Sequence, residues 1–257
     1  MLSIVSAFTF DQTKTIFTPL LIILFLMKTI AESVVAFNKS LSFTGVLPKG
    51  INLLNPFKNN PAILKISEEF YGKYYNDTKP RRMILGINPG RHGAGVTGIP
   101  FSDTKRLKEF CGINITQFSS HELSSVFIYD MIMACGGVRK FYNKFYINSI
   151  CPLGFTSSGT TGTREKNYNY YDSPALYKAM YPFIVKSIRR QIAFGFSSEV
   201  CYCMGMGTNY KFFMKINENE KLFNEIIPLE HPRFIMQYRL KKKDEYIKKY
   251  LEALKLH

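Results

Sequence analysis

Residues 84–101 read ILGINPGRHGAGVTGIPF, a short apolar run that leads into a loop rich in glycine and proline. The run predicts a strand over residues 81–87 that ends at the loop. Residues 93–98 match the pattern GxGxxG, which binds dinucleotides only where it opens a helix at once. Pro100 follows instead, and proline disfavours helical geometry at the residue before it. A P-loop would need Gly-Lys-Ser/Thr, and Val96 follows Gly95. Neither phosphate-binding pattern is therefore favoured.

Further apolar strands and amphipathic helices alternate along the chain. The sequence predicts strands over 145–150, 199–204 and 225–229, with residues 43–60 and 156–172 as loops. Predicted helices cover 28–40, 61–75, 174–194, 208–217 and 240–255, and another runs to about 134 from a capping box of Ser119 and Glu122. Alternation of this kind is typical of a parallel sheet with helices on both faces. We therefore predict a three-layer α/β/α fold with a short, mostly parallel central sheet.

Ligands of such folds bind beyond the carboxyl ends of the strands. Three polar segments follow predicted strands and should converge there: the one from Asn88, the pair Asn148 and Ser149, and His231.

The net charge of the chain indicates a polyanionic partner. Its 257 residues carry a formal charge of +15, which favours nucleic acid or an anionic membrane surface. The five cysteines are odd in number and form no CxxC, so neither a disulfide framework nor a zinc site is predicted. Buried free thiols in a reducing cytoplasm are expected.

Residues 1–26 differ from the rest of the chain. Residues 16–27, IFTPLLIILFLM, are apolar but too few to span a bilayer, which takes about 20 residues. We expect residues 1–26 to be an extension from a misassigned start and residues 27–257 to form one domain. A signal peptide and a membrane anchor are the alternatives.

Three stretches carry a family resemblance. Residues 88–101, NPGRHGAGVTGIPF, resemble without a gap the first motif of the SMUG-type uracil-DNA glycosylases, the single-strand-selective monofunctional branch of their superfamily. Residues 226–233, IIPLEHPR, fit its second motif, and residues 151–153, CPL, resemble another family stretch. The likeness to the bacterial second SMUG subfamily is broader and covers roughly residues 28–252.

The resemblance implies a monofunctional DNA glycosylase of the uracil-DNA glycosylase fold, which acts in base excision repair. It implies a monomer without metal or nucleotide cofactor, whose partner is DNA containing uracil or other deaminated bases, and no membrane. It implies that Asn88 holds the attacking water and that His231 donates to the departing base. Gly90 would let the loop backbone approach the base, and Phe101 would stack on it.

Two positions depart from the family pattern. The base-reading asparagine of the family lies two residues before the cysteine, where this chain has Ser149, with Asn148 one residue earlier. We favour Ser149 as the residue that faces the base. The second motif continues with Arg233 rather than serine, so the wedge that enters the duplex must be built differently.

Three candidate DNA contacts follow His231 on a predicted loop: Arg233, Gln237 and Arg239. Two other hypotheses remain at this point. One is a non-catalytic nucleic-acid-binding protein of the same fold, and the other is a nucleotide-dependent enzyme that uses the GxGxxG.

Overall fold

The computed structural model describes residues 28–157 and 165–255. The prediction for residues 1–26 lies outside these residues. The central sheet contains four parallel strands in the order β3-β2-β6-β7. These strands are β2 (Arg82–Gly86), β3 (Phe145–Ser149), β6 (Val200–Met204) and β7 (Glu225–Leu229). Each was predicted from its buried apolar run, and the predicted fold class is confirmed.

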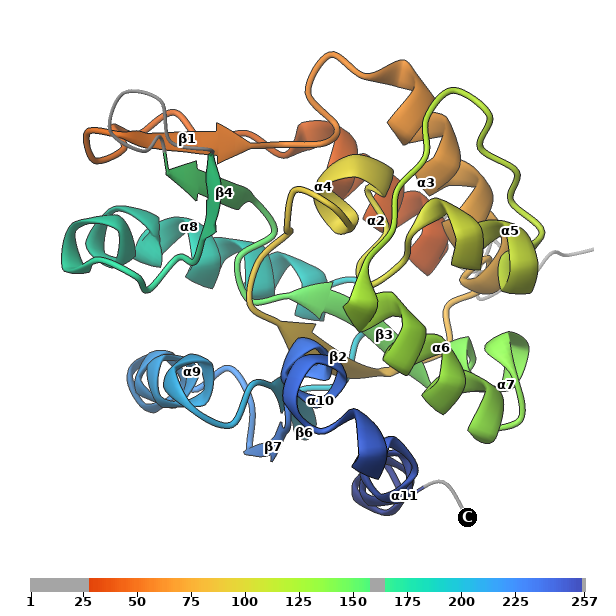
Figure 1. The fold of residues 1–257 in the computed structure, drawn as a ribbon. Helices are drawn as coiled ribbons and strands as arrows, with labels where there is room; N and C mark the ends of the chain where they lie inside the picture. Colours follow the sequence, from red (N-terminus) through yellow and green to blue (C-terminus); the bar gives the residue numbers. More distant parts are fainter. Residues whose placement is uncertain (1–27, 158–164, 256–257) are drawn as a thin grey trace, which may run out of the picture.

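Helices cover both faces of the central sheet (Figure 1). The longer ones are α2 (Ile30–Ser40), α3 (Pro61–Tyr74), α6 (Leu123–Ala134), α8 (Pro174–Ile192), α9 (Thr208–Glu220) and α11 (Lys243–Ala253). Tyr146 of β3 packs against Tyr71 of α3 and donates to Gln191 of α8, at 3.1 Å, on one face. On the other face Arg82 of β2 donates to the carbonyl of Leu254, just after α11, at 3.1 Å.

Two helix starts agree with the capping residues in the sequence. Asn60 accepts a hydrogen bond from the Ile63 N–H at the start of α3, and Ser173 does the same at the start of α8. Each is followed by proline at the first helical position, where the missing N–H costs nothing.

The second sheet was not predicted. Strands β1 (Ile51–Leu54), β4 (Gly154–Ser157) and β5 (Lys166–Tyr168) form an antiparallel sheet in the order β1-β4-β5. This second sheet lies apart from the central sheet; β1 and β4 are at the upper left of Figure 1. The sequence predicted loops over 43–60 and 156–172, which is wrong in part. The strands are only three or four residues long, too short for a period of two to stand out.

The capping box predicted for α6 is also wrong. Glu122 occupies the N-cap position itself and makes no side-chain capping bond. The carboxylate of Asp103 accepts from the Glu122 N–H instead, at 3.0 Å. A long-range partner has therefore replaced the local one that the spacing from Ser119 suggested.

Shorter helices complete the chain: α4 (Ala94–Thr97), α5 (Thr104–Cys111), α7 (Val138–Tyr142), α10 (Pro232–Tyr238) and the 3-10 turn η1 (Leu240–Lys242). The glycine-rich loop thus forms a single helical turn, α4, which ends at Gly98 in the left-handed region, φ 72°. The loop predicted after His231 is the helix α10. Pro232 at its first position is the signal that could have identified this helix.

All five cysteines are buried and free. Across residues 28–157 and 165–255, none of the helices has the length and apolar character needed to cross a bilayer.

Candidate active site

A cleft of about 380 Å³ opens at the carboxyl ends of the central strands. The polar side chains that line it come from five regions: the loop after β2, the end of β3, strand β5 with its flank, the start of α6, and α10 with the residue before it. Seven of the residues predicted from the sequence line it: Asn88, Gly90, Phe101, Ser149, His231, Arg233 and Gln237. Asn148 and Arg239 do not. The cleft therefore forms where the predicted strand ends converge.

Strand β5 and the residues just after it orient the side chain of Asn88. Its Nδ2 donates to the carbonyl of Tyr168 at 3.2 Å, and its Oδ1 accepts from the N–H of Tyr170 at 3.1 Å. This pair of bonds fixes which end of the amide is oxygen. An amide oxygen has two lone pairs, so Oδ1 can accept one further hydrogen bond from a molecule in the cleft.

Phe101 occupies a strained backbone conformation, with a φ of +53°. A non-glycine residue in the left-handed region costs free energy and is concentrated at functional sites. Its ring lies over Gly86, where an added Cβ would come within 2.8 Å of two ring atoms. The centroid of the Phe101 ring is 6.0 Å from that of His231. The glycine therefore provides the space that lets the aromatic ring form one wall of the cleft.

His231 is held as a neutral hydrogen-bond donor. It is the N-cap of α10, and its Nδ1 accepts from the N–H of Arg233 at 3.1 Å. Burial, with a smaller contribution from the charge of Arg233, lowers the pKa of His231 to about 4. Because Nδ1 accepts, the single proton of the neutral ring is on Nε2. Near neutral pH this nitrogen can donate to a bound group without carrying a charge.

Asn148 and Ser149 lie on opposite faces of β3, as the alternation of a strand requires. Ser149 lines the cleft. The Asn148 amide points to the other face and donates to Tyr146 Oη and Gln191 Oε1, each at 2.6 Å. Its oxygen accepts from the Ser149 N–H at 2.8 Å. Asn148 therefore makes its hydrogen bonds in the core. Of the two residues, only Ser149 can contact a molecule in this cleft.

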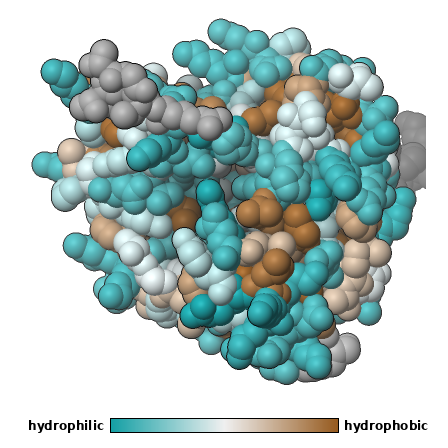
Figure 2. Space-filling view, viewed as in Figure 1, coloured by the Kyte–Doolittle hydropathy of each residue, from teal (hydrophilic) through white to brown (hydrophobic). Residues whose placement is uncertain are grey.

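Helix α10 and the turn η1 after it form an exposed apolar ridge at the rim of the cleft. We call Phe234, Tyr238 and Leu240 the α10 ridge; their exposed fractions are 40%, 66% and 56%. The rings of Phe234 and Tyr238 are 5.7 Å apart, and the Arg239 guanidinium lies 5.4 Å from the Phe234 ring centroid. Figure 2 shows apolar side chains gathered on this side of the molecule, over the region of α6 and α10. Arg239 is therefore placed on the ridge rather than inside the cleft.

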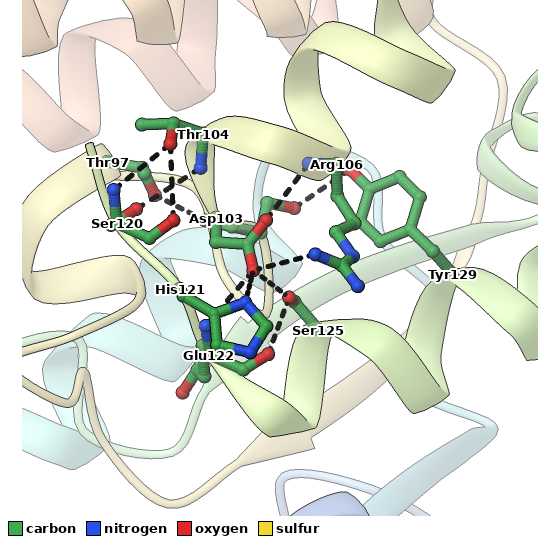
Figure 3. Close-up of polar contacts among 10 residues, drawn as sticks. Thr97, Asp103, Thr104, Arg106, Ser120, His121, Glu122, Ser125 and Tyr129 are labelled. Carbon is green, nitrogen blue, oxygen red and sulfur yellow. Dashed lines mark hydrogen bonds and ion pairs between the residues drawn. The ribbon is translucent and has the colours of Figure 1, made fainter. Parts of the chain in front are cut away.

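Several cleft residues were missed, among them the polar residues Glu122, Asn167 and Asn169. The two asparagines come from the segment around β5, which had been read as a loop. Glu122 is positioned by Asp103 (Figure 3), a fully buried carboxylate that also accepts from the Arg106 N–H at 2.9 Å and Ser125 Oγ at 2.7 Å. Asp103 thereby joins the starts of α5 and α6. The helix-capping position of Asp103 was the one local signal for this arrangement.

In the part of the chain that the structure describes, no group of histidine, cysteine or acidic side chains is placed to hold a metal ion.

Comparisons with known proteins agree with the sequence motifs. Residues 73–255 match the family model described as the uracil DNA glycosylase superfamily. The fold is similar to the crystal structure of wild-type Pedobacter heparinus SMUG2, with a TM-score of 0.86 and 55% sequence identity. That match covers 89% of this chain and 98% of the other. A search of curated proteins gave no match.

Proposed function

The chain belongs to the uracil-DNA glycosylase superfamily, and we propose that it hydrolyses the N-glycosidic bond of uracil in DNA within the cleft described above. The observation that supports this most directly is the placement of Asn88, Phe101 and His231 around one cavity. Enzymes that act on a base in duplex DNA must first flip it out of the stack into such a cavity.

Each of the three side chains suits one requirement of the reaction. Breaking the bond leaves positive charge on the sugar and negative charge on the departing base. Asn88 Oδ1 would hold the water that attacks the sugar carbon, Phe101 would stack on the base, and His231 Nε2–H would donate to the base oxygen. Fixed donors of this kind stabilise charge that develops in the transition state.

The direct test is a uracil-containing oligonucleotide incubated with the protein and then treated with alkali. Strand cleavage that depends on both the protein and the uracil supports a glycosylase. Binding of the same oligonucleotide without cleavage would favour the non-catalytic alternative, which no feature of the cleft supports.

We propose a monomer, because the cleft is built entirely from one chain. The cytoplasm is the proposed location, supported by the five free thiols, which suit a reducing compartment.

The range of bases should depend on Ser149. A serine hydroxyl can rotate and either donate or accept one hydrogen bond to the base. An asparagine amide can instead contact two adjacent edge atoms of uracil at once. We therefore propose that the enzyme also accepts other deaminated bases, such as xanthine. Ser149→Ala is expected to change the ratio of xanthine to uracil release by about tenfold, the worth of one hydrogen bond. Single-turnover rates on both substrates measure that ratio.

Asn148→Ala is the matched comparison. It should leave the ratio unchanged and lower the melting temperature, because Tyr146 and Gln191 each lose a hydrogen-bond partner. The opposite pattern, lost uracil release in Asn148→Ala and an unchanged range in Ser149→Ala, would show that the wrong strand residue has been chosen.

The DNA-binding surface is proposed to centre on α10 and the residues after it. Four cations lie on α10 and on the short segment between it and α11: Arg233, Arg239, Lys241 and Lys242. The α10 ridge beside them offers apolar groups that could enter the base stack where the nucleotide has left it.

Affinity for undamaged DNA should fall steeply with salt, because these cations displace counterions from phosphates. If all four engage phosphates, a plot of log affinity against log salt has a slope of about −3 to −4. Arg233→Gln and Arg239→Gln should each make the slope shallower by about 1. Lys144→Gln, at the opposite edge of the central sheet, is the control and should change nothing. A flat salt response would rule out this surface.

A further inference from the structure

Glu122 is the one carboxyl group among the residues that line the active-site cleft. It also lines a smaller neighbouring cavity of about 130 Å³, together with Gly90, Asn167 and Arg233, which face both spaces. The side chain therefore forms part of the wall between the two. Neither the water-holding role of Asn88 nor the donor role of His231 explains a carboxyl group here.

The Glu122 carboxyl group has one enclosed oxygen, Oε2, that lacks a hydrogen-bond partner among the described residues. The glycine-rich loop closes directly over it, since a Cβ on Gly93 would lie 2.0 Å from that oxygen. Asp103 holds the backbone of Glu122 from the other side. The backbone of Glu122 is therefore fixed by Asp103, and the glycine-rich loop covers its Oε2.

Charges of both signs face Glu122 from the neighbouring elements. Asp103, before α5, is the nearest anion, with Arg106 and His121 each 3.5 Å from its Oδ2. Arg233 of α10 is the cation that acts on Glu122, and His92 and His121 line the neighbouring cavity. Burial, reinforced by Asp103 and opposed by Arg233, raises the pKa of Glu122 to about 7. In the free protein near neutral pH, both forms of the carboxyl are therefore populated.

DNA in the cleft would change this balance in one direction. In the proposed complex Arg233 pairs with a DNA phosphate. The positive charge of Arg233 would then no longer stabilise the ionised form of Glu122. The phosphates themselves add negative charge close by. An ionised carboxylate that is buried and unpaired is costly, and such a group takes a proton instead.

We propose that Glu122 takes up one proton from solvent when DNA occupies the cleft, and that it faces the DNA as a neutral carboxylic acid, able to donate a hydrogen bond. No covalent bond changes in this step. The inference rests on the proposed function, because it places DNA in this cleft.

Proton uptake makes affinity depend on pH with a definite sign. Above the pKa of the free protein, binding must include protonation of Glu122. The affinity for DNA then falls as pH rises. The loss is up to about tenfold per pH unit over the range in which Glu122 is ionised in the free protein and protonated in the complex. Below that pKa the proton is already present and the dependence disappears.

The test is the affinity for an undamaged oligonucleotide duplex, measured from about pH 6 to pH 9 at constant ionic strength. Wild type should lose about tenfold per unit above pH 7, whereas Glu122→Gln, which keeps the shape and is always neutral, should show no such slope. Glu199→Gln, an exposed glutamate at the amino end of β6 and so at the opposite end of the strands from the cleft, is the matched control and should behave as wild type. His92→Gln and His121→Gln should also retain the slope.

Calorimetry of wild-type binding in two buffers with different ionisation enthalpies gives an independent reading that needs no variant. It should show uptake of close to one proton per complex above pH 7. Wild type that binds DNA without this uptake would overturn the inference and leave the proposed function intact. A slope that persists in Glu122→Gln would also overturn it. Failure of wild type to bind DNA at any pH would instead remove the proposed function.

Discussion

Asn88→Ala is expected to lower the single-turnover rate of uracil release by ~10²–10³-fold, while affinity for uracil-containing DNA changes only a few-fold. The side chain is oriented at both ends by backbone groups, with Oδ1 left able to accept from a water. Removing it leaves that water without a fixed position, which affects the transition state far more than the ground state. Rapid-quench measurement with enzyme in excess separates this step from binding.

Asn224→Ala provides the control for the Asn88 variant. It makes the same chemical change at an exposed position at the amino end of β7, away from the cleft at the carboxyl ends of the strands, and should retain the wild-type rate. If Asn88→Ala also released uracil at the wild-type rate, the attacking water would have to be held by another residue.

His231→Ala is expected to cause a loss of similar size, ~10²–10³-fold, because the donor to the departing base disappears. The same residue predicts an unusual pH profile. Burial lowers the pKa of His231 to about 4, so the ring stays neutral where an ordinary histidine would titrate. At saturating enzyme, the rate should show no step from His231 near pH 6.5. Protonation near pH 4 would place a hydrogen on Nδ1 and break its bond to the Arg233 N–H.

The pH profile distinguishes a neutral donor from a charged one. Single-turnover rates of wild type and His231→Ala should be compared across about pH 5 to 8. A step near pH 6.5 in wild type that is absent in His231→Ala would mean that the imidazolium is the active form. That result would contradict the neutral donor inferred from the structure.

The central sheet could be predicted from the sequence because each of its strands contains a short, mostly apolar run, and three of the four runs are almost wholly buried. Helices α3 and α8 could be predicted from Asn60-Pro61 and Ser173-Pro174, since capping is a local interaction. The antiparallel sheet could not. Strand β5 reads Lys-Asn-Tyr, and its pairing with β4 depends on contacts between segments that have no shared local pattern.

In the candidate site too, residues with a local sequence signal could be predicted, and features that depend on distant contacts could not. Asn88 and His231 were predicted because each follows shortly after a strand of the parallel sheet and lies in a recognisable motif. The role of Glu122 was mistaken because its spacing from Ser119 suggested a local cap, whereas Asp103 makes the bond to its N–H from 19 residues away. The orientation of Asn148 away from the cleft also depends on a distant residue, Gln191 of α8.

The bonds that orient Asn88 join it to residues 80 and 82 positions later in the chain. The first partner, Tyr168, belongs to the small sheet and the second, Tyr170, follows it directly. That sheet contains three short strands, and structure of this size opens locally at lower free energy than a central core does. Contacts between residues so distant in sequence also form late, because the intervening chain must first be closed into a loop. Catalytic competence should therefore be the last property gained in folding and the first lost on warming, while the central sheet is still intact.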